Sequence, residues 1–163
     1  NLKMIKKTIL IFILLLTFTN YSLSAGTNSG GSNNYYEQAL PFIKSAKKYE
    51  AQGKMDKAKK RYSKALNILL KSNKEKPLQA DTLNYLGFTS RKLGDFKNAE
   101  NYYLAGLKIN PNHNGINEYL GELYLSTNRP EKAEERLAVL QNCDCEEYEE
   151  LKAIIDGTKQ SKY

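Results

Sequence analysis

The sequence repeats itself with a period of about 34 residues, and this period constrains the fold more than any other feature. When the chain is shifted by one period, the tripeptide Tyr-Leu-Gly at 85–87 falls on the same tripeptide at 119–121, and Ala99 falls on Ala133. Within each unit, apolar residues recur at spacings of three and four, as in amphipathic helices. The period therefore predicts a stack of two-helix units, each burying its apolar stripe against its neighbours.

Three units can be traced, over about 39–72, 80–113 and 114–147. Small residues recur where the first helix of a unit should pack closely on the second, and they are Ala46, Gly87 and Gly121 in the first helices and Ala58, Ala99 and Ala133 in the second. Large residues recur where neighbouring units should meet, and they are Tyr62, Tyr103 and Leu137. This alternation of small and large residues is what close helix packing requires.

An amphipathic segment follows the third unit. Asp144 and Glu147 have the spacing of a capping box, which predicts a helix start. The apolar residues that follow fall on one stripe, Tyr148, Leu151, Ile154 and Ile155. The residues off this stripe are expected to form a solvated face, and they are Glu146, Glu147, Glu149, Glu150 and Lys152. A solenoid needs such a helix to cover its end. We therefore expect an all-α fold over 35–156 with seven helices, and a disordered tail over 157–163.

The repeat residues resemble those of the tetratricopeptide repeat (TPR). The residues that carry the resemblance are Tyr49, Gly53, Ala58, Tyr62 and Ala65 in the first unit; Leu83, Leu86, Gly87, Leu93, Gly94, Ala99, Tyr103 and Pro111 in the second; and Leu120, Gly121, Tyr124, Pro130, Ala133 and Leu137 in the third. The third unit and the segment after it are also similar to small exported TPR proteins of alphaproteobacteria. The resemblance implies a TPR α-solenoid of three helix-turn-helix repeats with a C-terminal capping helix, which binds protein and has no enzymatic activity.

Residues 1–25 have the layout of a secretory signal peptide. Lysines precede the apolar run 8–19, and small residues at Ser24 and Ala25 follow it. The run is shorter than the roughly 20 apolar residues that a membrane-spanning helix needs. We expect cleavage after Ser24 or Ala25, a flexible linker over 26–34, and a periplasmic or secreted protein. The alternative is an uncleaved leader that anchors the chain in a membrane.

The net charge of +7 is a weak indication of nucleic-acid binding, because leader lysines contribute to it. We expect a protein or peptide partner and no nucleic acid. His113 is the only histidine, so neither a histidine-based catalytic triad nor a histidine-rich metal site can be built. We therefore expect no enzyme, no cofactor and no metal.

Cys143 and Cys145 form the one unusual constellation. In an oxidising compartment, two cysteines this close favour a disulfide that clasps the turn before the last helix. Separate thiols or an intermolecular bridge are the second possibility. A thiol redox or soft-metal role is the third.

The first helices of the three units should line a concave groove that accepts a peptide or a partner helix. The groove residues that we predict to bind the partner are Lys47, Asn84, Phe88, Arg91, Glu118 and Glu122. Phe88 is expected to point to solvent and to anchor the partner. Alternatively, Phe88 packs under the long connection at 71–79. The function that we expect is an exported scaffold that binds another protein, in the assembly of an envelope complex. The alternative is a thiol redox or soft-metal-handling protein that uses Cys143 and Cys145.

Overall fold

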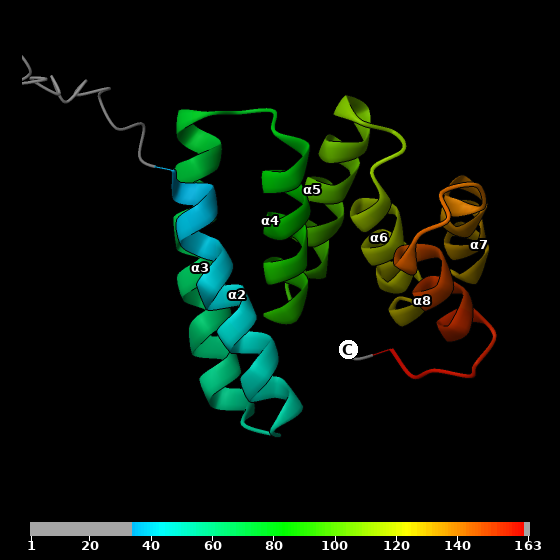
Figure 1. The fold of residues 1–163 in the computed structure, drawn as a ribbon, viewed down its shortest axis with the longest axis horizontal. Helices are drawn as coiled ribbons and strands as arrows, with labels where there is room; N and C mark the ends of the chain where they lie inside the picture. The colour runs from blue at the N-terminus through cyan, green and yellow to red at the C-terminus, as the bar shows by residue number, and fades with distance from the viewer. Residues whose placement is uncertain (1–33, 162–163) are drawn as a thin grey trace, which may run out of the picture. The chain divides into compact units, whose positions relative to one another are not determined.

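The computed structural model describes residues 34–161, which form seven α-helices and no strand. Consecutive helices pair into three hairpins, and a single helix follows them (Figure 1). The hairpins are α2 (Tyr35–Ala51) with α3 (Met55–Glu75), α4 (Ala80–Lys92) with α5 (Phe96–Ile109), and α6 (Asn114–Ser126) with α7 (Pro130–Leu140); the last helix is α8 (Glu146–Ile155). The predicted solenoid of three hairpins and a capping helix is confirmed.

The predicted signal peptide, 1–25, lies outside the described residues, as does the linker except for Asn34. The side chain of Asn34 caps α2 by accepting a hydrogen bond from the backbone N–H of Glu37 at 3.3 Å. None of the helices within 34–161 is both long and apolar enough to cross a membrane.

Each hairpin turns through one residue with a positive φ angle. Gly53 and Gly94 hold φ angles of 69° and 87°, a region that is strained for most side chains. The third hairpin uses Asn128 at 58°, and asparagine is among the few other residues that adopt this conformation readily. Pro130 then occupies the first turn of α7, where its missing N–H costs no hydrogen bond.

The small residues in the first helices sit at close approaches, although not all to the same neighbour. A Cβ atom on Gly87 would lie 2.4 Å from Cε1 of Tyr103, so α4 packs directly on α5, as the sequence predicts. A Cβ atom on Gly121 would lie 2.6 Å from Cδ2 of Leu151, which belongs to α8. The close approach expected between α6 and α7 at Gly121 is therefore a contact with the capping helix.

The start of α8 differs from the prediction. Its N-cap residue is Cys145, and no side chain makes a capping hydrogen bond there. Asp144 stands one position too early for the predicted capping box with Glu147, so that prediction is wrong. The helix start is instead favoured by acidic residues in its first turn, Glu146, Glu147 and Glu149, which interact well with the N-terminal end of the helix dipole.

Candidate functional site

The first helices of the hairpins, α2, α4 and α6, carry all six predicted groove residues. One period relates Asn84 to Glu118 and Phe88 to Glu122, so these residues hold equivalent positions on α4 and α6. We call the surface formed by these helices, together with the residues of α8 and of the chain after it that border it, the inner face.

Phe88 is fully buried, so the prediction that it points to solvent is wrong. Its ring lies 5.0 Å from the ring of Tyr119 on α6 and 5.8 Å from the ring of Tyr62 on α3. The ammonium group of Lys47 on α2 lies 4.7 Å from the centre of the Phe88 ring. Side chains of the first and third hairpins therefore both contact Phe88 on α4. The alternative of packing under residues 71–79 does not describe these contacts either.

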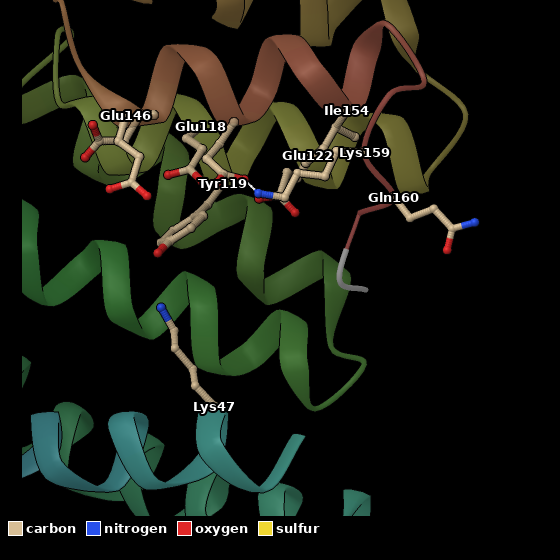
Figure 2. A pocket seen from close by; sticks show the side chains of 10 residues that line it. Lys47, Glu118, Tyr119, Glu122, Glu146, Ile154, Lys159 and Gln160 are labelled. Atoms are coloured by element: carbon tan, nitrogen blue, oxygen red, sulfur yellow. Dashed lines mark hydrogen bonds and ion pairs between the residues drawn. The ribbon is translucent and has the colours of Figure 1, made fainter. Parts of the chain in front are cut away.

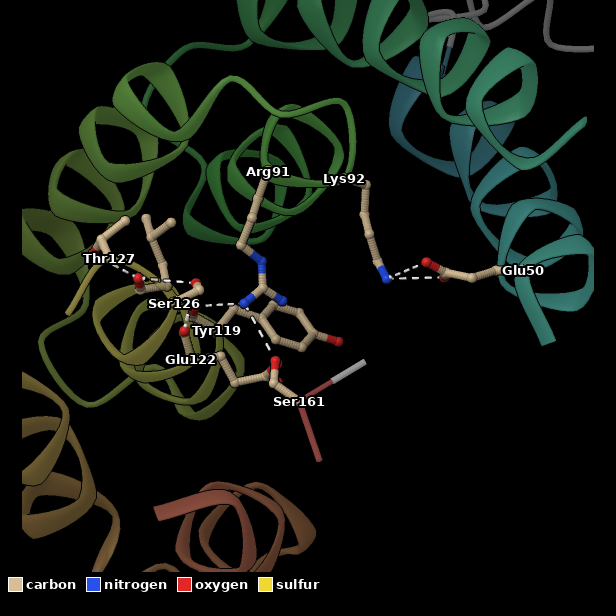
Figure 3. Close-up of polar contacts among 9 residues, drawn as sticks. Glu50, Arg91, Lys92, Tyr119, Glu122, Ser126, Thr127 and Ser161 are labelled. Carbon is tan, nitrogen blue, oxygen red and sulfur yellow. Dashed lines mark hydrogen bonds and ion pairs between the residues drawn. The ribbon is translucent and has the colours of Figure 1, made fainter. Parts of the chain in front are cut away.

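Arg91 and Glu122 are also buried, and they form an ion pair between α4 and α6. Nη1 of Arg91 lies 3.4 Å from Oε2 of Glu122 and donates to the carbonyl oxygen of Tyr119 at 3.3 Å (Figure 3). The guanidinium group also lies over the ring of Tyr119, 5.7 Å from its centre. Asn84 is 7% exposed. Four of the six predicted groove residues, Asn84, Phe88, Arg91 and Glu122, are therefore largely inaccessible to a partner.

The open part of the inner face is a hollow of about 260 Å³ between α2, α6, α8 and the chain that follows α8 (Figure 2). We call it the acidic hollow. It is lined by Lys47, Glu118, Tyr119, Glu122, Glu146, Glu147, Glu150, Ile154, Lys159 and Gln160. Sequence reasoning placed Glu147 and Glu150 on a solvated face, and the structure turns both toward this hollow.

Glu118 has an unusual electrostatic environment. Burial raises the pKa of its carboxyl group to about 8, and the neighbouring carboxylates Glu122, Glu147 and Glu150 raise it further, against a smaller lowering by Lys47. Among the residues that the structure describes, no cationic group lies within 4.0 Å of the Glu118 carboxylate. The acidic hollow therefore contains a partly buried carboxyl group that a cation would stabilise in its charged form.

A wider and more apolar hollow of about 670 Å³ lies on the N-terminal side of the inner face. We call it the apolar hollow, and its lining residues are Glu37, Leu40, Pro41, Ile43, Lys44, Lys47 and Tyr85. Lys47 lines both hollows. The accessible part of the inner face thus changes along its length from apolar to acidic, with Lys47 between the two ends.

A partly buried ion pair joins the first two hairpins. Nζ of Lys92 lies 2.7 and 2.8 Å from the two carboxylate oxygens of Glu50 (Figure 3). The hydroxyl of Tyr62 donates to the same carboxylate at 2.8 Å. Burial lowers the pKa of Lys92 to about 8, although the contact with Glu50 opposes this change. Hydrogen bonds satisfy both charged groups, so we assign this pair to hairpin packing.

His113 also has a structural role. It is the N-cap residue of α6, and its Nδ1 accepts a hydrogen bond from the backbone N–H of Ile116 at 3.2 Å. In the neutral ring the proton is then on Nε2, which lies 3.0 Å from Oδ1 of Asp81 and donates to it. His113 therefore ties the start of α6 to α4.

Cys143 and Cys145 are joined by a disulfide, with an S–S distance of 1.97 Å, in the turn between α7 and α8. Of the three possibilities that the sequence leaves open, the structure has the intramolecular bond. No group of three or more histidine, cysteine or acidic side chains suited to a metal ion occurs within the described part of the chain.

Comparisons with known proteins agree with the repeat pattern. Two family models of the tetratricopeptide repeat match the chain, one over residues 43–112 and the other over 90–155. Among solved structures, the chain is similar to the first TPR of Spaghetti (RPAP3) bound to the HSP90 peptide SRMEEVD, with 21% identity, a TM-score of 0.47, and coverage of 75% of this chain and 94% of that one. A comparison with curated proteins found no match. Tetratricopeptide-repeat models thus match the chain between residue 43 and residue 155.

Proposed function

We propose that this chain is an exported scaffold that binds a segment of another protein along its inner face. The observation that carries the proposal is that the acidic and apolar hollows meet at Lys47, which gives a continuous accessible surface along stacked first helices. Solenoids of helical repeats commonly use such extended surfaces for binding. A peptide or an amphipathic helix is the kind of ligand that a groove of this form accepts.

A binding role fits the side chains better than a catalytic one. The single histidine of the sequence is engaged at the start of α6. The two cysteines are bonded to each other, and a disulfide offers no thiolate nucleophile. We therefore assign no reaction and no cofactor to the inner face.

The proposed export rests on the sequence of residues 1–25 alone. A cleaved leader would place the scaffold in the periplasm or outside the cell, where it would act in the assembly of an envelope complex. N-terminal sequencing of the protein recovered from cell fractions tests this. A mature chain that begins near Ala25 or Gly26 supports export, and a cytoplasmic chain that retains Met4 contradicts it.

Photo-crosslinking tests the proposed binding surface. A photoreactive amino acid replaces Lys44, which is exposed beside the apolar hollow, or Lys60, an exposed residue of α3 that lines neither hollow. We expect a defined adduct from position 44 and none from position 60. Equal adducts from both positions, or adducts from position 60 alone, contradict binding at the inner face.

A thiol function of Cys143 and Cys145 is the second candidate, favoured by the closed disulfide beside a hollow of about 380 Å³. In this function the pair would accept two electrons and two protons from a dithiol, leaving two thiols here and a disulfide in the partner. Thiol titration with and without reductant, followed by equilibration with glutathione, tests it. A pair that stays oxidised at the potential of the glutathione pool is structural.

A further inference from the structure

We propose that the segment bound by the inner face is basic, and that its Lys or Arg side chain takes the place that Lys159 of this chain occupies in the acidic hollow. This inference rests on the proposed function, because it names the chemistry of the partner for the same surface. Three observations carry it: the charge of the hollow, its internal occupant, and its continuity with the apolar hollow.

The charge of the acidic hollow is unbalanced. Five acidic side chains line it, against the ammonium groups of Lys47 and Lys159 and the guanidinium group of Arg91, which pairs with Glu122. Lys47 lies over the rings of Phe88 and Tyr119, at 4.7 and 5.9 Å from their centres. Glu118 has no cation within 4.0 Å among the described residues, and its surroundings are partly closed to water. A cationic side chain is therefore the ligand group that the hollow would stabilise most.

The chain places a cation of its own in this hollow. After α8, the backbone N–H groups of Thr158 and Lys159 both donate to the carbonyl oxygen of Ala153 at 3.0 Å, which turns the chain back along the helix. The ammonium group of Lys159 then pairs with Glu150, and the hydroxyl of Ser161 donates to Oε2 of Glu122 at 3.1 Å (Figures 2 and 3). The predicted tail, 157–163, is thus placed against the inner face over 157–161, and residues 162–163 lie outside the described part.

The contacts of this internal segment are exchangeable. They consist of a few hydrogen bonds and one partly exposed ion pair, and none of the residues 157–161 is buried. Ion pairs of this kind contribute little net stability, because water solvates the separated charges well. A partner that brings its own ammonium or guanidinium group can therefore replace Lys159 at small cost.

The apolar hollow completes the description of the partner. Leu40, Pro41 and Tyr85 offer apolar surface in this hollow, which shares Lys47 with the acidic hollow. A segment that spans both hollows thus needs an apolar side chain toward one end and a basic side chain toward the other. An acidic segment would meet the five carboxylates and be repelled.

Fluorescence anisotropy with three labelled peptides of equal length tests the inference. All three peptides carry a leucine at the same position. They differ only at the remaining test positions, which are arginine in the first peptide, glutamine in the second and glutamate in the third. We expect the arginine peptide to bind about tenfold more tightly than the glutamine peptide, and the glutamate peptide not to bind. Binding should weaken as the salt concentration rises, because salt screens exposed charges.

A matched pair of variants locates the binding. Glu146→Gln with Glu147→Gln removes two carboxylates that line the acidic hollow, and neither makes an ion pair among the described residues, so the fold should persist. We expect the arginine peptide to bind about tenfold more weakly to this variant. Glu131→Gln with Glu134→Gln makes the same charge change at exposed positions of α7 and should leave binding unchanged. Equal losses in both variants overturn the inference.

A substitution in the segment after α8 gives an independent test, because it should strengthen peptide binding rather than weaken it. Lys159→Gln removes the internal cation, and we expect the arginine peptide to bind about threefold more tightly. Lys152→Gln, which breaks an exposed pair with Asp156 away from the hollow, is the control and should change nothing. Unchanged binding to Lys159→Gln overturns the replacement of Lys159 by the partner.

The outcomes separate this inference from the proposed function. Preferred binding of the glutamine or glutamate peptide, or no binding of the arginine peptide, overturns the basic partner. If crosslinking from position 44 still yields a defined adduct, binding at the inner face stands with a different partner chemistry. If that adduct is missing as well, the proposed function fails with the inference.

Discussion

Equivalent positions of α4 and α6 have different surroundings. At one pair of equivalent positions, Phe88 and Glu122 are both buried. At the other pair, Asn84 is buried, whereas Glu118 lines an open hollow. The difference follows from the neighbours. α4 lies between two complete hairpins, whereas α6 has a complete hairpin on one side and the single helix α8 on the other.

This comparison shows that exposure in a solenoid depends on the place of a unit in the stack as much as on the position within the repeat. The middle unit is covered by Lys47 on one side and Tyr119 on the other. The last unit keeps part of its inner face accessible because ten-residue α8 covers it incompletely. The inner face of α4 should therefore contribute mainly to stability, and that of α6 mainly to binding.

The largest expected effect is at the centre of α4. Phe88→Ala removes a fully buried ring that contacts Tyr62 and Tyr119, so we expect the free energy of unfolding to fall by about 3–5 kcal/mol. Urea denaturation measures the loss. Phe96→Ala is the control, because Phe96 is 42% exposed and its removal should cost much less. Similar losses in the two variants would break the assignment of Phe88 to the core.

The next largest effect is expected where α4 and α6 share a charge pair. Arg91→Met leaves Glu122 buried without its cation, which should cost about 3 kcal/mol. Adding Glu122→Leu should recover much of the loss, because two apolar side chains then replace the pair. Urea denaturation of the single variants and of the double variant gives the coupling free energy between Arg91 and Glu122. A double variant that is less stable than Arg91→Met alone contradicts the pairing.

The fold was largely predictable from the sequence because its determinants repeat. The period and the small alanines describe packing within one repeat unit. The contact of Gly87 with Tyr103 likewise joins residues that are close in the chain. The neighbour of Gly121 was not predictable in the same way, because Leu151 lies in a helix that follows a different pattern. Local spacing also misplaced the start of α8, where Asp144 precedes the N-cap residue.

The candidate site was predictable only in its chemistry. The sequence places the predicted site on the first helices and includes Lys47 and Glu118, which line the acidic hollow, but it assumes that one repeat position has one exposure. Phe88 is covered by a tyrosine of another hairpin, and helix periodicity carries no information about such a contact. The acidic stripe of α8 was the available signal for the hollow. Spacing within one helix indicates only a solvated face, because it carries no information about the return of the chain at Lys159.

A smaller effect should distinguish the two glycines at equivalent positions. Alanine at Gly87 gains up to about 1 kcal/mol of helix propensity, but its Cβ meets the buried ring of Tyr103 at 2.4 Å. We expect a net loss of about 1–2 kcal/mol, since a packed ring cannot move aside freely. Alanine at Gly121 meets the end of the Leu151 side chain on the single helix α8, which can adjust, so we expect a change near zero. Comparison of the urea midpoints tests the difference, and equal losses would mean that α8 is packed as firmly as α5.

The smallest effect is the pH dependence contributed by Glu118. Because the pKa of this carboxyl group is raised from 4.5 to about 8, the folded protein holds its proton more firmly than the unfolded chain does. The stabilisation is therefore fully present below pH 4.5 and is lost as the pH rises toward 8. We expect Glu118→Gln to gain stability relative to the wild type between pH 5 and pH 8, by on the order of 1 kcal/mol, since solvent reaching the hollow screens the neighbouring carboxylates.

Thermal melting of the wild type and of Glu118→Gln at pH 5 and pH 8 measures this difference, with Glu131→Gln on the exposed face of α7 as the control. Parallel pH profiles for the wild type and Glu118→Gln would contradict the crowding of Glu118 by Glu122, Glu147 and Glu150. The arginine peptide sharpens the test. A bound cation stabilises the ionised carboxylate, so it should lower the pKa of Glu118 and reduce the loss of stability between pH 5 and pH 8. At Asn84 the same repeat position of α4 holds no ionisable group, so the contribution of Glu118 has no counterpart at that position.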